Sequence, residues 1–304
     1  METLKKIDVH VHTMRYPEIS LPRPGGDNYA SPEQLLAMYD AWGIERGVLL
    51  PEITNECCLT ASTSEEVCMI SREHPDRFFW FCNLTPRMGG NSTSYDFGYC
   101  LSHYKKLGAK GVGEICYNMP FDDPMSENLL SACAAYEMPI IIHIADRVGG
   151  TYGVYDDPGL PRIERMLKKY PKLRVIGHSQ CFWAEISADV TEADRSQYPK
   201  GKVKEGRLHT LLRTYPNLFC DISAGSGGNA ILRDEEHGLR FLDEFKDRIM
   251  YGTDICSPKN FFPVGGWLDQ KHAEGAVSDE TYYKVCRGNA IRELKLPIRD
   301  DVTF

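Results

Sequence analysis

Short runs of β-branched and aromatic residues recur along the whole chain, and each is followed by a longer segment with helical punctuation. The runs predict eight strands: Ile7–His12, Gly47–Pro51, Phe78–Leu84, Gly111–Cys116, Pro139–Ile144, Leu173–His178, Leu218–Ile222 and Ile249–Asp254. Between them, Ser31 followed by Pro32 predicts a helix start, and prolines 171 and 216 predict helix ends just before strands. Strand and helix therefore alternate along the chain.

Eight such units without a shift in composition or a linker rich in proline and serine favour one closed parallel barrel over two doubly wound domains. We predict an α/β fold in which residues 1–304 form a single (β/α)8 TIM barrel domain. The longest loops, 17–28, 149–161 and 180–201, follow the first, fifth and sixth predicted strands. They are expected at the C-terminal face of the strands, where such barrels carry their active sites.

Composition excludes several classes of protein. The 304 residues are 42% hydrophobic and 26% charged, which is ordinary for a folded domain. The net charge of −8 disfavours binding to nucleic acid. No apolar run approaches the roughly 20 residues that cross a bilayer, and the first residues hold no secretory apolar segment, so we expect a cytoplasmic protein. The 11 cysteines include no Cys-x-x-Cys pair and are expected to be reduced.

Imidazole and carboxylate groups gather near the ends of five predicted strands. The residues are His10, His12, Glu114, His143, His178 and Asp254. Because strand side chains alternate, both histidines of the first strand point to one face, with Asp8 on the same face. The C-terminal ends of barrel strands meet at one mouth, so these groups predict a metal site. This donor set suits Zn²⁺ first, and Mn²⁺, Fe²⁺ and Co²⁺ are also compatible.

The pattern of His-x-His on the first strand, His on the fifth and sixth and Asp on the eighth resembles the amidohydrolase superfamily of metal-dependent barrels. Four segments resemble its amidohydrolase 2 branch, which includes aminocarboxymuconate-semialdehyde decarboxylase: IDVHVH at 7–12, IGH at 176–178, YGTD at 251–254 and GNA at 288–290. The resemblance implies four metal ligands, His10, His12, His143 and Asp254. It also implies that His178 faces the substrate as a polarising or proton-transferring group.

Glu114 departs from the commonest pattern of this superfamily, which often places a carboxylated lysine on the fourth strand. A glutamate there can bridge two metal ions, serve one ion, or act as an acid or base. The number of ions per chain, one or two, therefore stays open.

The leading prediction is a metal-dependent hydrolase, in which metal-bound hydroxide attacks an amide, lactone or ester carbonyl of a small molecule. His178 would polarise that carbonyl and Asp254 would move the proton, with Glu114 as the third catalytic group. The alternatives are a non-oxidative decarboxylase of an aromatic or enoic acid, a non-catalytic metal-binding barrel and a metal-dependent phosphoesterase. Members of the resembling family often form dimers, so a homodimer is expected.

Several further residues are placed only by position. Arg147 is expected to bind a substrate carboxylate, and Trp183, with Phe182 and Tyr152, to form an apolar wall of the substrate pocket. Glu52 and Asp221 should lie at the mouth of the barrel. The remaining histidines fall in predicted helices or connections and are expected to be solvated: His74, His103, His209, His237 and His272.

Overall fold

The computed structural model describes residues 4–22, 27–300 and 302. Eight parallel strands form its centre: β1 (Lys6–Val11), β2 (Ile44–Leu49), β3 (Phe78–Trp80), β4 (Val112–Ile115), β5 (Ile140–Ala145), β7 (Val175–His178), β8 (Leu218–Asp221) and β9 (Ile249–Met250). Each overlaps one of the eight predicted strands. A ninth strand, β6 (Val154–Tyr155), lies in the loop after β5 and pairs with its end. The sequence pattern did not predict β6.

Backbone hydrogen bonds close the strands into a barrel. The strand order is β1-β2-β3 in one set and β4-β5-β7-β8-β9 in the other. Between β3 and β4, the amide of Cys82 donates to the carbonyl of Gly111 at 3.0 Å. On the other side, the amide of Val9 in β1 donates to the carbonyl of Tyr251 just after β9, also at 3.0 Å. The predicted TIM barrel fold is confirmed.

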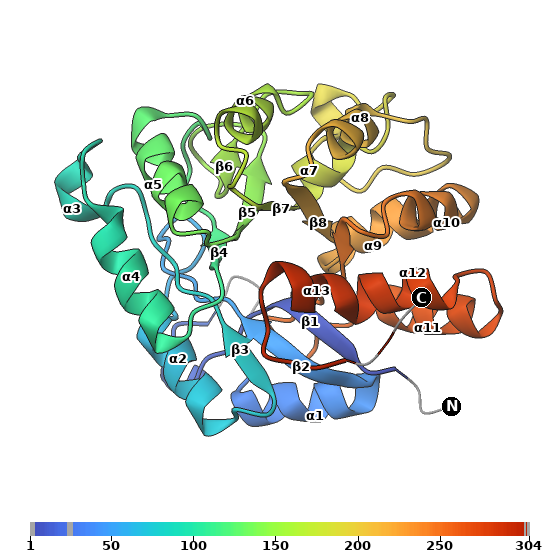
Figure 1. Ribbon diagram of the computed structural model, residues 1–304, viewed down its shortest axis with the longest axis horizontal. Coiled ribbons are helices and arrows are strands. Elements are labelled where there is room, and N and C mark those ends of the chain that lie inside the picture. Colours follow the sequence, from blue (N-terminus) through green and yellow to red (C-terminus); the bar gives the residue numbers. More distant parts are fainter. Residues whose placement is uncertain (1–3, 23–26, 301, 303–304) are drawn as a thin grey trace.

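Helices surround the strands on the outside of the molecule (Figure 1). They are α1 (Pro32–Trp42), α2 (Ser64–Glu73), α3 (Met88–Asn91), α4 (Phe97–Leu107), α5 (Pro124–Ala135), α6 (Pro161–Lys169), α7 (Gln180–Ala184), α8 (Arg207–Thr214), α9 (Ala224–Leu232), α10 (Glu235–Glu244), α11 (Val264–Ala273), α12 (Asp279–Tyr283) and α13 (Asn289–Glu293), with short turns η1 (Pro17–Ile19), η2 (Glu192–Asp194) and η3 (Lys284–Gly288). Within the described residues, no helix has the length and apolar character needed to cross a membrane.

Helix α1 starts and ends as its sequence dictates. The side chain of Ser31 accepts a hydrogen bond from the amide of Gln34, whose own side chain accepts one from the amide of Ser31. Pro32 supplies a first helical residue that needs no hydrogen-bond partner. Gly43 ends the helix in a left-handed conformation, with φ of 66°.

The interior of the barrel is filled by apolar side chains. Residues from seven strands and from the C-terminal segment form one buried cluster: Ile7, Val9, Val48, Leu50, Phe79, Phe81, Ile141, Ile176, Phe219, Met250, Ala290, Leu294 and Leu296. A second, larger cluster packs the strands against the surrounding helices. The described interior of the barrel is therefore a packed core, which leaves the mouth as the place for chemistry.

The expectation that Asp8 lies on the same face as His10 is wrong. The pairing of β1 with β2 shifts register between Asp8 and Val11, so strict alternation does not hold there. Asp8 points toward α1, where its carboxylate accepts a hydrogen bond from the Tyr39 hydroxyl at 2.7 Å.

The expectation of solvated histidines is also wrong for His209 in α8 and His237 in α10. Both are buried, and their Nε2 atoms lie 3.0 Å apart, so one ring donates to the other. Phe241 packs against both rings. Because helices α8 and α10 pack together, their facing histidines are removed from water.

Candidate metal centre

Three imidazoles point to one place at the mouth of the barrel. His10 of β1 and His12, which directly follows β1, bring their Nε2 atoms within 3.2 Å of each other. The ring of His178, at the end of β7, lies 4.4 Å from the ring of His10 between centroids. All three side chains are buried.

The outer nitrogens of these rings are held by acceptors. Nδ1 of His10 lies 2.9 Å from one oxygen of Asp221, and Nδ1 of His178 lies 3.1 Å from the other. Nδ1 of His12 lies 3.0 Å from the carbonyl oxygen of Leu50. An acceptor at Nδ1 fixes the proton there and leaves the Nε2 lone pair free to bind a metal. Sequence reasoning placed Asp221 at the mouth but missed this role.

Glu114 faces two groups of nitrogens with its two oxygens. Oε2 lies 3.5 Å from Nε2 of both His10 and His12. Oε1 lies 3.0 Å from Nδ1 of His143 and 4.0 Å from Nε2 of His178. The carboxylate therefore lies between two sets of donors.

Asp254 completes the ring of donors from the segment after β9. Its Oδ1 lies 3.6 Å from Nε2 of His10 and 3.4 Å from Nε2 of His12, and its Oδ2 lies 3.7 Å from Nε2 of His178. The residue has φ of 58°, in the left-handed region, which costs on the order of 1–3 kcal/mol for a residue other than glycine. A hydrogen bond of 2.7 Å from its amide to the carbonyl of His10 holds this conformation. Its side chain is 25% exposed, so it faces the mouth.

The imidazoles and the carboxylates of the centre shift each other's pKa values. Burial by itself would raise the pKa of Glu114 and of Asp254, but the neighbouring imidazoles, with His10 the largest contributor, lower both. Burial would likewise lower the pKa of His10 and His12, but the surrounding carboxylates raise both well above their usual value. In the absence of another cation, protons on the imidazoles balance the carboxylates.

The donor set fits a divalent cation. In the part of the chain that the structure describes, every ion pair within 4.0 Å of the four carboxylates at the mouth involves a histidine and none involves lysine or arginine; the carboxylates are Glu52, Glu114, Asp221 and Asp254. Neutral imidazoles would leave this negative charge uncompensated, and a metal ion would supply the missing positive charge. Three Nε2 atoms with two carboxylates are ligands that zinc and related ions prefer.

His143 lies in the second of the two donor sets. Besides its contact with Glu114, its ring packs against Tyr152 from the loop after β5, with 4.5 Å between centroids. Its ring nitrogen lies within 4.8 Å of a carboxylate oxygen of Glu114 and of the Cys116 sulfur, so these three residues could hold one metal ion. His10, His12 and Asp254 form a separate group of the same kind.

A cavity of about 540 Å³ opens beside the centre. Its described walls come from the loops after β1, β2, β5 and β9, and include Tyr29, Cys57, Tyr152 and Asn260. Tyr29 also donates a hydrogen bond to Glu52, whose carboxylate lies 3.4 Å from Nδ1 of His12. Tyr152 thus lines the cavity, as expected of a pocket wall.

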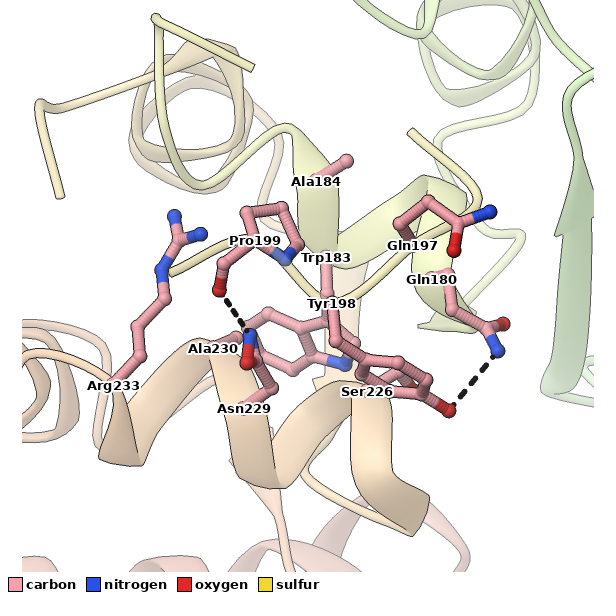
Figure 2. A pocket seen from close by; sticks show the side chains of 10 residues that line it. All are labelled: Gln180, Trp183, Ala184, Gln197, Tyr198, Pro199, Ser226, Asn229, Ala230 and Arg233. Atoms are coloured by element: carbon pink, nitrogen blue, oxygen red, sulfur yellow. Dashed lines mark hydrogen bonds between the residues drawn. The ribbon is translucent and has the colours of Figure 1, made fainter. Parts of the chain in front are cut away.

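The two residues expected to bind substrate have other contacts. Arg147 is 58% exposed and pairs with the carboxylate of its neighbour Asp146 at 2.9 Å. Trp183 is buried, and its indole N–H donates to the backbone carbonyl of Asp221 at 3.1 Å. Figure 2 shows Trp183 of α7 in the lining of a pocket that also includes Tyr198 and residues of α9. Trp183 therefore supports the residue that orients His10 and His178, and a direct role of either residue in substrate binding stays a prediction.

Comparison with known proteins gives the family. The amidohydrolase family profile matches residues 7–296. The chain belongs to the amidohydrolase family. It is accordingly an enzyme of that superfamily. A comparison with curated proteins finds no significant match.

Solved structures share the fold of this chain over nearly its whole length. An uncharacterised TIM-barrel protein from Bordetella bronchiseptica is 18% identical, with a TM-score of 0.63, and the match covers 96% of this chain and 99% of that chain. An amidohydrolase from Burkholderia multivorans with bound zinc is 14% identical, with a TM-score of 0.62 and coverage of 97% and 100%. The 2,6-dihydroxybenzoate decarboxylase from Rhizobium is 16% identical, with a TM-score of 0.56 and coverage of 96% and 98%.

Proposed function

We propose that this amidohydrolase is a hydrolase with two divalent metal ions that cleaves an amide, lactone or ester of a small molecule. The observation that supports the proposal most is the position of Glu114, with one oxygen toward His10 and His12 and the other toward His143 and His178. A carboxylate with two such sets of neighbours is suited to bridge two ions. Zinc is the ion we favour, because the ligands are mainly imidazoles and a similar barrel binds zinc.

We assign the donors to two positions. His10, His12 and Asp254 would hold one ion. His143 and His178 would hold the other, with Glu114 shared between the two, although His178 also forms a potential ligand group with His10 and Glu114. Ions bound there would lower the pKa of a coordinated water toward neutrality and polarise a substrate carbonyl.

The protein's own groups would handle the proton. The Asp254 carboxylate is the part of the centre most open to the mouth, and its oxygens lie 3.4–3.7 Å from three Nε2 atoms. It is therefore placed to accept the proton of the attacking water and to deliver it to the leaving nitrogen or oxygen. The cavity beside it, lined by Tyr29 and Tyr152, would hold the remainder of the substrate.

Decarboxylation, the reaction of the Rhizobium relative, is the second candidate. A decarboxylase must hold an anionic substrate, and Arg147, the residue expected to do so, is turned toward Asp146 and solvent. This orientation of Arg147 favours hydrolysis of a carbonyl compound.

The test combines metal content with product analysis. The wild-type protein, purified without chelator, should contain nearly two ions per chain by elemental analysis, and Glu114→Gln should contain about one. The control Glu192→Gln, on an exposed loop residue, should match the wild type. The wild type should hydrolyse members of a panel of aryl esters, lactones and anilides and release no carbon dioxide from aromatic acids. One ion per chain in both proteins, with release of carbon dioxide, would contradict the proposal.

A further inference from the structure

A cysteine lies beside the second set of donors. Glu114 and Cys116 are two residues apart at the end of β4, and Cys116 is only 2% exposed. The Sγ atom of Cys116, a carboxylate oxygen of Glu114 and a ring nitrogen of His143 all lie within 4.8 Å of one another. Ligands around a tetrahedral zinc ion are about 3.3–3.8 Å apart, from metal–ligand bonds of about 2.0–2.3 Å. A modest movement of these side chains would therefore bring all three onto one ion.

A second thiol supports this position. Cys57, from the loop after β2, lies next to Cys116 and lines the cavity at the mouth. A buried thiol that serves only to pack is expected among apolar groups, whereas Cys116 lies between a carboxylate, an imidazole and another thiol.

We propose that Cys116 is a ligand of the second metal position, together with Glu114 and His143. The inference rests on the proposed two-metal function and adds to it a sulfur donor. On binding, the thiol would release its proton to solvent, and the S–H of Cys57 would donate a hydrogen bond to the resulting thiolate. A thiolate is a soft donor, so this position would favour zinc, cadmium and cobalt over magnesium and manganese.

Cobalt spectroscopy on the whole protein tests the ligand directly. The chain, freed of metal with chelator and reloaded with two Co²⁺ per chain, should show a sulfur-to-cobalt charge-transfer band in the near ultraviolet. The variant Cys116→Ser should lose this band and bind the second Co²⁺ at least about tenfold more weakly. Two controls should keep the band: Cys57→Ser, which removes only the neighbouring thiol, and Cys133→Ser, which removes a buried thiol of α5.

The outcomes separate this inference from the function on which it rests. Two bound Co²⁺ and hydrolysis without the sulfur band would overturn the inference and leave the hydrolase proposal standing. A band that persists in Cys116→Ser would also overturn it. Binding of a single ion by the wild type would overturn both proposals. If Cys116→Ser fails to fold, cadmium NMR of the wild type decides, because a sulfur ligand shifts the cadmium resonance strongly downfield and its absence there overturns the inference.

Discussion

Asp221 and His10 are joined by a hydrogen bond of 2.9 Å between Oδ2 and Nδ1, and the other oxygen of the same carboxylate holds His178 at 3.1 Å. One buried side chain thus orients two rings of the metal centre. Burial alone would raise the pKa of Asp221, but the two imidazoles, with His178 the larger contributor, lower this pKa well below its usual range. The carboxyl group therefore stays ionised.

Replacement of Asp221 by Asn should therefore weaken metal binding. Asparagine has one acceptor oxygen, so it can accept a hydrogen bond from only one of the two rings. The other ring is then free to turn or to carry its proton on the other nitrogen. We expect the dissociation constant for zinc to rise about 10- to 100-fold while the circular dichroism spectrum is unchanged. Competition with a chromogenic chelator measures the constant, and Asp247→Asn, a surface change, serves as the control. An unchanged dissociation constant in Asp221→Asn would contradict the assigned role.

The metal-free protein should respond to pH in a way that the metal-bound protein does not. The carboxylates raise the pKa of His10 and His12 well above 6.5 despite burial. The folded state then binds these protons more tightly than the unfolded chain does. The stability that they contribute is fully present below about pH 6.5 and is lost as the pH rises through the raised values.

Chelator-treated protein should thus melt at a lower temperature at pH 9 than at pH 7, whereas the zinc-loaded protein should change much less over this interval. Differential scanning calorimetry of both forms checks this. Equal shifts in the two forms would show that the imidazoles are not the groups that titrate.

The histidine pair between α8 and α10 should make the fold sensitive to acid. Burial, followed by the neighbouring His209, lowers the pKa of His237 to about 4. The folded state therefore binds this proton less tightly than the unfolded chain, and the stability present above about pH 6.5 is lost as the pH falls toward 4. We expect a loss of roughly 1–3 kcal/mol over this range.

Urea unfolding at several pH values measures this loss. His237→Gln keeps a hydrogen-bonding side chain but does not titrate, so its free energy of unfolding should fall less steeply over the same range. His272→Gln, which changes a partly exposed histidine on α11, should keep the slope of the wild type. If the free energy of unfolding of His237→Gln fell with pH as steeply as that of the wild type, the histidine pair would not be the source of the acid sensitivity.

Two adjacent glycines of α9 should respond to alanine in opposite directions. A Cβ at Gly227 would lie 2.4 Å from the backbone carbonyl carbon of Ile222, so Gly227→Ala forces the helix away from the end of β8. We expect it to cost about 1–3 kcal/mol of unfolding free energy. A Cβ at Gly228 would meet nothing within 4 Å, and Gly228→Ala should stabilise the helix by about 0.4–1 kcal/mol. Thermal unfolding of the two variants checks the contrast, and a loss of stability in Gly228→Ala would contradict it.

The barrel could be predicted because its strands are apolar runs punctuated by helix signals. The ends of the strands could not be predicted, because they depend on hydrogen bonding to neighbouring strands. The third predicted strand runs to Leu84, but regular pairing stops at Trp80, and Cys82 meets β4 only as an isolated bridge. Strand β6 has two residues and forms only because its loop folds back on β5. Helix α9 begins with Ala-Gly-Ser-Gly-Gly, which is a weak helix former, and packing on the barrel overrides this propensity.

The candidate donors that gather at the mouth could be picked out from the sequence because each lies in or close to the end of a predicted strand, but their supporting groups could not. Asp221 was placed at the mouth, yet nothing in a linear pattern shows that one carboxylate reaches two rings from different strands. The orientation of Arg147 was open for the same reason, since a loop residue follows no periodicity. Asp8 was assigned to the wrong face because a shift of register cannot be read from alternation.

The hydrogen bond from the amide of Thr253 to Asp8, at 2.9 Å, joins residues 245 positions apart. It lies beside the place where Asp254 meets the histidines of the first strand. During synthesis on the ribosome, His10 and His12 emerge at the start and must wait for the last barrel strand before they gain this carboxylate. A nascent chain would hold two exposed imidazoles without their partner for most of its translation. The complete set of donors can therefore form only after the last barrel strand has been made.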